Sequence, residues 1–108
     1  MDGSISAPDL ARRLGTPDAP RLLDVRQVEE HELVALPDSR LVPLGELFQR
    51  APELADWKDE EIVVYCHHGM RSLRAIAILE SLGFTRLTNL TGGIDAWSTQ
   101  VDRSLPRY

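Results

Sequence analysis

The fold is decided by the stretch "VVYCHHGMRSLRAIAILESLGF", which runs from Val63 to Phe84. It contains the single cysteine of the chain, Cys66, between an apolar run and a helical pattern. The segment "EEIVVYC", which ends at this cysteine, is typical of a strand covered on both faces. Beyond the loop "HHGMR", apolar residues recur at the i, i+3, i+4 and i+7 spacing of a buried helix face: Ala75, Ile78, Leu79 and Leu82. The stretch therefore predicts a strand, a loop carrying a thiol, and a helix closed by a left-handed cap at Gly83.

The flanking sequence alternates between strand and helix patterns. "SAPDLARRLG" predicts a helix that Ser6 caps and that ends before Gly15, while "PRLLDVR" and "SRLVPL" predict short strands, the second ending near Pro43. "QVEEHELVA" and "GELFQRAPELADW" are compatible with short helices. "RLTNL" predicts a last strand, and "IDAWSTQV" a last helix with Trp97 in the core. This alternation predicts an α/β fold with a mainly parallel sheet covered by helices.

Length and composition limit the class of protein. With 108 residues, 43% of them hydrophobic, we expect one domain over residues 1–108, and a surface tail over 100–108 because "DRSLPRY" shows no periodicity. A net charge of −5 argues against a nucleic-acid-binding protein. No apolar run is long enough to cross a bilayer, and Met1, Asp2 and Gly3 do not resemble a secretory leader. A single cysteine cannot form an internal disulfide, so we expect a cytoplasmic protein.

Cys66 lies where parallel sheets bind their ligands, beyond the carboxyl end of a strand. A loop at this position turns backbone N–H groups inward, and the dipole of the following helix, expected to begin near Ser72, adds partial positive charge. Gly69 allows a tight turn, and Arg71 adds a cation. These features favour thiolate over thiol. We therefore predict a lowered pKa for Cys66 and an activated nucleophile, with Ser72 as the helix cap.

These residues also have plainer interpretations. Cys66 alone could be a small buried hydrophobe, although the glycine, the arginine and the helix start beside it favour reactivity. His67 and His68 suggest a metal, but adjacent residues rarely bind one ion and no other cysteine or histidine cluster completes a ligand set, so no metal is expected. The two are interpreted as a polar, partly cationic mouth or as exposed residues. His31, within "EEHE", is interpreted as a surface residue.

Four motifs in order resemble those of the rhodanese-like sulfurtransferases over essentially the whole chain. They are "LLDVR" with the charged residues Asp24, Arg26 and Glu29, "VPLGEL", the loop "VVYCHHGMRS" and "LTGGIDAW". The loop and the ending "GGIDAWSTQVDRSLPRY" look most like the rhodanese domain at the C-terminus of enzymes that activate ubiquitin-like sulfur-carrier proteins for molybdopterin and thiamine synthesis. One motif departs from the family: "VALPDSRL" stands where "GHIPGA" is usual, and we interpret it as a changed structural loop.

The resemblance implies a central, mainly parallel five-stranded sheet with helices on both faces. It implies that Cys66 takes a sulfane sulfur from a donor such as thiosulfate, holds it as a persulfide and passes it to cyanide, a thiol or a sulfur-carrier protein. The loop residues expected to cradle that sulfur are His67, His68, Gly69, Met70 and Arg71. Asp24 and Arg26 match a charged pair that supports the loop. The chemistry that the resemblance implies needs no metal or organic cofactor, and the net charge and short apolar runs predict no nucleic-acid or membrane partner.

Two other functions would use the same features. Phosphatases and arsenate reductases of this fold also use a cysteine, a backbone cradle and an arginine, but their loop has one residue more than the four between Cys66 and Arg71, because a tetrahedral oxyanion needs a wider cradle. A non-catalytic binding or redox-sensing module is the second, since a thiol of low pKa oxidises readily. Domains of this fold that lose catalysis typically lose the cysteine, which is present here. A protein-to-protein sulfur relay would differ only in its partner.

Overall fold

The computed structural model describes residues 3–108. Its strands are β1 (Ser4–Ile5), β2 (Arg21–Asp24), β3 (Arg40–Leu41), β4 (Ile62–Tyr65) and β5 (Leu87–Leu90). Its helices are α1 (Ala7–Arg13), α2 (Val28–Leu33), α3 (Leu47–Arg50), α4 (Met70–Ser81) and α5 (Gly93–Gln100), with 3₁₀ turns η1 (Leu44–Glu46) and η2 (Ala51–Trp57). The expectation about a leader also concerned Met1 and Asp2, which lie outside the described residues. Within residues 3–108, no helix is long and apolar enough to cross a membrane.

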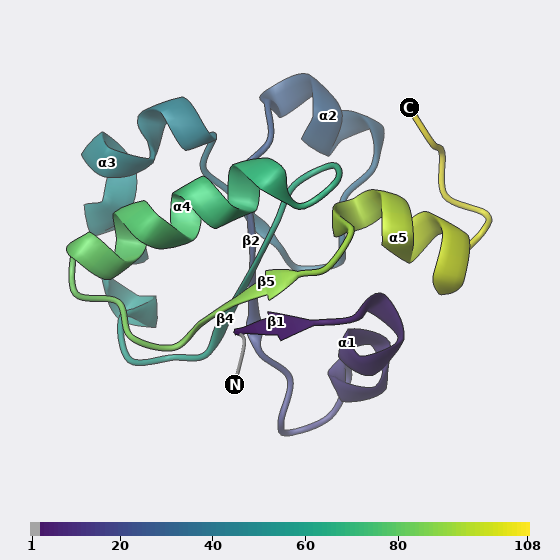
Figure 1. Ribbon diagram of the computed structural model, residues 1–108, viewed down its shortest axis with the longest axis horizontal. Coiled ribbons are helices and arrows are strands. Elements are labelled where there is room, and N and C mark those ends of the chain that lie inside the picture. The colour runs from purple at the N-terminus through teal and green to yellow at the C-terminus, as the bar shows by residue number, and fades with distance from the viewer. Residues whose placement is uncertain (1–2) are drawn as a thin grey trace.

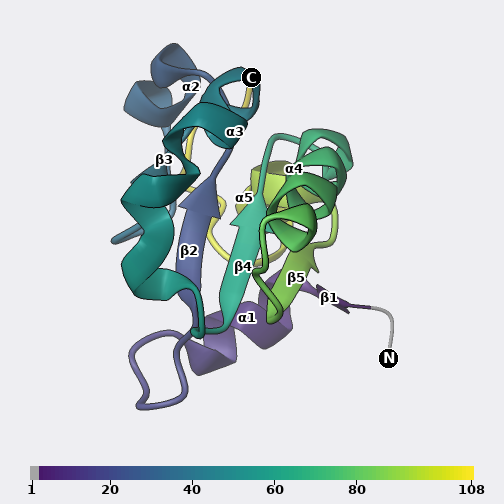
Figure 2. The same cartoon turned by 90° about the vertical axis from the view of Figure 1, so that its left-hand side faces the viewer.

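The five strands form one sheet in the order β1-β5-β4-β2-β3, and every neighbouring pair is parallel (Figure 1; β3 is labelled in Figure 2). The predicted α/β class with a parallel five-stranded sheet is therefore confirmed. The strand predicted to end at Cys66 is β4, which lies at the centre of the sheet between β2 and β5. The edge strand β1 was not predicted, because two residues immediately before a helix cap are too few to show a period.

Side chains alternate between the two faces of the sheet and build two cores. In β4, Ile62 and Val64 pack with α3, η2 and α4, whereas Val63 and Tyr65 pack with α1 and α5. Figure 2 shows this layering, with α3 and α4 in front of the sheet and α5 behind it. Trp97 is buried in the second core, as the sequence predicted. Both faces of β4 are thus covered by helices, which fixes the position where the strand ends.

The predicted helix ends are confirmed by the backbone. Ser6 caps α1 by accepting a hydrogen bond from the Asp9 N–H (3.2 Å), and Gly83 follows α4 with φ +94°, a conformation that favours glycine. The third strand ends at Leu41, just before Pro43. These signals are local in the sequence, which is why they could be predicted.

The unusual segment "VALPDSRL" is held by a tyrosine of the central strand. The hydroxyl of Tyr65 accepts a hydrogen bond from the Leu36 N–H (3.1 Å) and lies 2.9 Å from the Ser39 hydroxyl. Leu36 itself is buried in the second core. The changed loop therefore has a defined path to β3, with the Tyr65 hydroxyl satisfied by it.

Candidate active site

The thiol of Cys66 lies immediately beyond β4 and below the first turn of α4. The helix begins at Met70, two residues before the expected start, because Gly69 takes the N-cap position with φ +107°. The predicted capping role of Ser72 is therefore wrong. Ser72 is a buried residue inside the first turn, and its hydroxyl reaches back to the Gly69 carbonyl (3.1 Å) and to Oδ1 of Asn89. The loop is consequently shorter and tighter than the sequence indicated.

Hydrogen bonds converge on the buried sulfur. Cys66 is 1% exposed, the Gly69 N–H donates to its Sγ (3.0 Å), and the Ser72 hydroxyl lies 3.6 Å from Sγ. Burial acts to raise the pKa of the Cys66 thiol, but bonds from the Ser72 backbone and hydroxyl and from the N–H groups of Gly69 and Arg71 outweigh it. The pKa of Cys66 is therefore lower than its ordinary value. This cradle of N–H groups suits a sulfur anion.

The N-terminus of α5 holds the other side of the loop. The Ile94 N–H donates to the Cys66 carbonyl (2.9 Å), and the Asp95 N–H donates to the His67 carbonyl (3.0 Å). Gly93 permits this approach: its φ is +62°, and a Cβ there would collide with the same two carbonyl oxygens. The motif "TGGIDAW" thus has a physical role, because two helix N–H groups that would lack a partner within α5 fix the backbone of the cysteine.

Arg71 does not point freely into the loop. Its guanidinium makes a two-pronged ion pair with Glu30 of α2, with N–O distances of 2.7 and 2.8 Å. Hydrogen bonds from Arg71 lower the pKa of Glu30 to about 2. The hydrogen bonds to Glu30 raise the pKa of Arg71, and a smaller electrostatic interaction with Cys66 acts in the same direction. Arg71 therefore acts on the sulfur through its backbone N–H and, at longer range, through a charge shared with Glu30.

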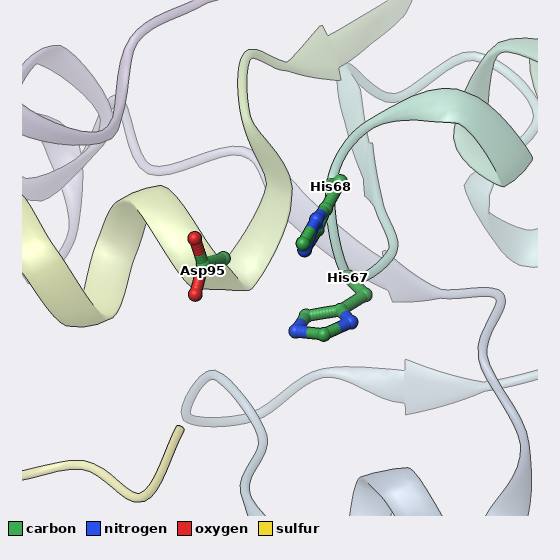
Figure 3. Close-up of side chains that lie close together, drawn as sticks. All are labelled: His67, His68 and Asp95. Atoms are coloured by element: carbon green, nitrogen blue, oxygen red, sulfur yellow. The ribbon is translucent and has the colours of Figure 1, made fainter. Parts of the chain in front are cut away.

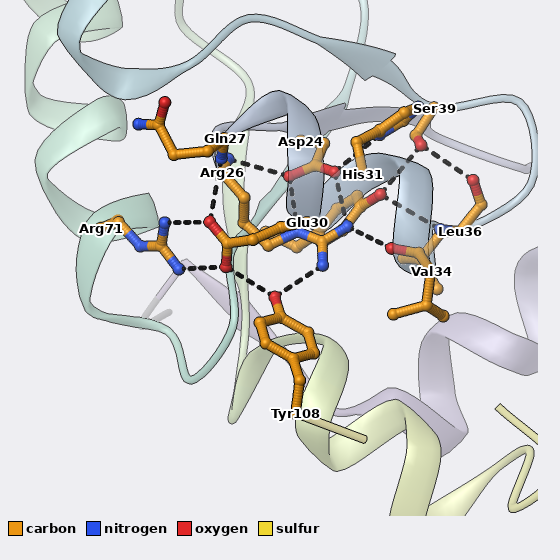
Figure 4. Close-up of polar contacts among 11 residues, drawn as sticks. Asp24, Arg26, Gln27, Glu30, His31, Val34, Leu36, Ser39, Arg71 and Tyr108 are labelled. Carbon is orange, nitrogen blue, oxygen red and sulfur yellow. Dashed lines mark hydrogen bonds and ion pairs between the residues drawn. The ribbon is translucent and has the colours of Figure 1, made fainter. Parts of the chain in front are cut away.

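Asp24 and Arg26 form a fully buried ion pair next to this bridge. Arg26 donates from its backbone N–H and Nε to Oδ1 of Asp24 (both 2.9 Å), and from Nη2 to Oδ2 (2.7 Å). His31 is not a mere surface residue, since its Nδ1 lies 2.8 Å from the same Oδ2. That interpretation was wrong because α2 turns the histidine back toward the end of β2. The pair and its partners appear together in Figure 4.

The last residue of the sequence, Tyr108, reaches this network. Its hydroxyl accepts a hydrogen bond from Arg26 (2.7 Å) and donates one to Glu30 (2.7 Å), and its ring stacks on His67 with 3.9 Å between ring centroids. Figure 4 shows Tyr108 between the two guanidinium groups. The tail thus lies on the surface but ends against the active loop.

The two histidines of the loop meet Asp95 of α5 at the rim of the site (Figure 3). One ligand atom from each of these three side chains lies within 4.8 Å of the others. The Asp95 carboxylate is already bound by Arg107, at 3.0 and 3.2 Å. His68 and Met70 are exposed, His67 is half-buried, and burial lowers the pKa of His67. The rim is therefore polar, and the shift of the His67 pKa disfavours a positive charge on that ring.

The comparison with known families agrees with this geometry. A model described as the rhodanese-like domain matches residues 6–100. The chain belongs to the rhodanese-like family. The resemblance stated from the motifs is thus confirmed.

Relatives of this rhodanese-like domain include proteins named as sulfurtransferases. A sulfurtransferase of Allochromatium vinosum is 35% identical, over 91% of this chain and 90% of that protein. The adenylyltransferase and sulfurtransferase uba4 of Ogataea parapolymorpha is 35% identical over 89% of this chain. The solved structure of the human single-domain sulfurtransferase TSTD1 superimposes with a TM-score of 0.77 at 28% identity, covering 91% of this chain and 96% of that one. These relatives support sulfur transfer as the general activity of the domain.

Several curated relatives are much longer than the rhodanese-like domain. The chain spans 24% of uba4 and 31% and 52% of two other relatives. The additional activities and partners of those longer proteins therefore do not follow from the similarity.

Three site residues of the rhodanese-like domain were missed from the sequence: Glu30, Asn89 and Tyr108. Glu30 and Tyr108 lie 41 and 78 residues from the partners they meet, so only the fold brings them together. Asn89 carried a weak signal, because it is a polar residue inside the apolar strand pattern "RLTNL". Its burial beside Ser72 shows that it completes the hydrogen bonds below the cysteine.

Proposed function

We propose that the protein is a thiosulfate-type sulfurtransferase that works through a persulfide on Cys66. The Cys66 thiolate attacks the outer sulfur of thiosulfate; a new S–S bond forms, the old one breaks, and sulfite leaves with the bonding electron pair. An acceptor nucleophile then attacks the terminal sulfur of the persulfide and releases the Cys66 thiolate. The observation that carries the proposal is the buried sulfur of lowered pKa with N–H donors aimed at it.

The chemistry needs stabilisation of an anion more than proton transfer. A persulfide is more acidic than a thiol, so its terminal sulfur is anionic at neutral pH, and backbone N–H groups can stabilise that charge. Gly69, Arg71 and Ser72 supply the donors that already lower the pKa of Cys66. Within this scheme, His67, His68 and Met70 line the entrance, and the Asp24–Arg26 pair supports the loop from β2. The steps require no metal or organic cofactor.

We further propose that the physiological acceptor is a thiol or a sulfur-carrier protein in the cytoplasm. The relative uba4 combines an adenylyltransferase with a sulfurtransferase, which makes a carrier protein a reasonable acceptor. The reduced state of the single buried cysteine, on which the reaction depends, suits a reducing compartment.

Sulfur transfer from thiosulfate to cyanide tests this proposal. The parent protein should form thiocyanate catalytically, and Cys66→Ser should reduce the rate to that of the uncatalysed reaction while keeping the unfolding transition. If Cys66→Ser turns over as fast as the parent, the persulfide mechanism is wrong. If the parent ignores thiosulfate but hydrolyses p-nitrophenyl phosphate in a Cys66-dependent way, the phosphatase alternative replaces it. Inertness toward both, with reversible oxidation of Cys66, would favour a redox-sensing module.

A further inference from the structure

Tyr108 contacts both ends of the active loop. Its ring lies flat on His67, the residue after Cys66, with an interplanar angle of 8°. Its hydroxyl donates to Oε2 of Glu30, the oxygen that also accepts from Nη2 of Arg71 at the other end of the loop. One side chain of the tail therefore touches the cradle at its first residue and, through Glu30, at its last.

The carboxylate that holds Arg71 depends on polar contacts for its position. None of the six residues of α2, the helix that carries Glu30, is buried. This helix is instead held by side-chain contacts: the Glu30–Arg71 pair, the His31–Asp24 contact, and the Tyr108 hydroxyl. The Tyr108 hydroxyl also accepts a hydrogen bond from Arg26, which is fully buried. Tyr108 thus connects the Glu30 carboxylate, which also accepts from Arg71 and from the Gln27 N–H (3.0 Å), to the buried cation Arg26.

The protonation state of Tyr108 suits this connection. Burial, together with the hydrogen bond to Glu30, raises the pKa of Tyr108 to about 12 although Arg26 opposes the shift. The hydroxyl therefore stays protonated at neutral pH and can donate to Glu30 while it accepts from Arg26.

We propose that Tyr108 is a positioning residue that orients Arg71 through Glu30 and thereby sets the preference of the site for anionic donors. This inference rests on the proposed function for its biological meaning. An anionic donor must approach a thiolate, so it is repelled unless a cation faces it. The Arg71 side chain is 33% exposed at the loop and is paired with Glu30. The orientation of its guanidinium therefore decides how strongly it attracts an anionic donor.

Two alkylating reagents of similar reactivity but different charge separate this role from a structural one. Iodoacetate is an anion and iodoacetamide is neutral, and both modify Cys66 without any sulfur transfer. Tyr108→Phe keeps the ring but removes the hydroxyl. We expect the ratio of iodoacetate to iodoacetamide rates to fall about fivefold, as expected for the loss of about one hydrogen bond. The iodoacetamide rate and its pH profile should stay near those of the parent.

A matched control and a second substitution complete the test. Arg103→Ala changes a tail residue whose guanidinium bonds only to the Thr99 carbonyl among its described contacts, and it should keep the parent ratio. Tyr108→Ala removes the stacking as well, so its ratio should fall at least as far as that of Tyr108→Phe. An unchanged or increased ratio in Tyr108→Phe overturns the inference, as does an equal acceleration of both reagents, which would mean simple loosening of the fold.

The proposed function can fail separately. If the parent prefers iodoacetate, loses that preference in Tyr108→Phe, and still takes no sulfur from thiosulfate, the positioning role of Tyr108 stands and the sulfurtransferase proposal falls. If thiosulfate is used, the KM for thiosulfate should rise in Tyr108→Phe by about the same factor while kcat changes little.

Discussion

The two ends of the active loop are held by different kinds of contact. At the Cys66 end, N–H groups of α5 bind the carbonyls of Cys66 and His67, and the close approach depends on Gly93. At the Arg71 end, the contacts are made by side chains: Glu30, Tyr108 and the buried Asp24–Arg26 pair. Backbone contacts therefore place the nucleophile, whereas a network of side chains sets the charge around it.

The largest effect is expected from breaking the buried pair at the side-chain end. Asp24→Ala would leave Arg26, which is fully buried, without its carboxylate. We expect the free energy of unfolding to fall by about 3–5 kcal/mol, the usual cost of an uncompensated buried charge. Denaturant unfolding measures this. As a control, Asp56→Ala breaks the exposed pair with Arg40 and should cost far less; equal losses in both variants would contradict the assigned burial.

The next largest effect is expected at the backbone end. Gly93→Ala places a Cβ against the carbonyl oxygens of Cys66 and His67, at a φ of +62° that alanine disfavours. We expect a loss of about 2–3 kcal/mol in the free energy of unfolding and a change in the alkylation rate of Cys66. Gly45→Ala is the matched control, because nothing lies within 4 Å of a Cβ there. A Gly93→Ala protein as stable and as reactive as the parent would show that α5 does not fix the loop.

A smaller effect is expected from the charge of Glu30. Its pKa is lowered from 4.5 to about 2 in the folded protein, so its contribution to stability is present above pH 4.5 and is lost as the pH falls toward 2. Glu30→Gln should therefore lower the free energy of unfolding at neutral pH by on the order of 2 kcal/mol and flatten its decline below pH 4.5. Unfolding curves across this range measure both changes.

The control for Glu30 is another glutamate paired with an arginine. Glu53→Gln removes an exposed partner of Arg50 and should leave the pH dependence nearly unchanged, because solvent screens that pair. A parent-like slope in Glu30→Gln would mean that the bridge to Arg71 adds no stability.

The smallest change in stability is expected for Ser72, which lies below the middle of the loop. Its substitution should instead change the reactivity of Cys66. Ser72→Ala removes the hydroxyl that lies 3.6 Å from Sγ and that lowers the pKa of Cys66. The curve of iodoacetamide rate against pH should move to higher pH. Ser98→Ala is the control, since Ser98 is also a buried helical serine but donates to the Ile94 carbonyl of its own helix. Coincident curves for Ser72→Ala and the parent would remove Ser72 from the cradle.

The same contrast explains what the sequence could predict. The strand, the cysteine, the helix face and the glycines Gly69 and Gly83 are encoded within a few residues of one another, so periodicity and turn chemistry were sufficient. The start of α4 was misplaced by two residues because Ser72 is a good cap in principle, while Gly69 was needed for the turn itself. Glu30 and Tyr108 could not be predicted, since 78 residues separate them and only the assembled sheet brings them together.

The mass of the protein after incubation with thiosulfate shows whether Cys66 takes up sulfur. We expect a gain of one sulfur atom per chain on the peptide that contains Cys66. The gain should be absent from Cys66→Ser and should disappear when cyanide is added. A parent protein that gains no sulfur, or a Cys66→Ser variant that gains the same mass, would contradict the proposal that the cradle beyond β4 holds a persulfide.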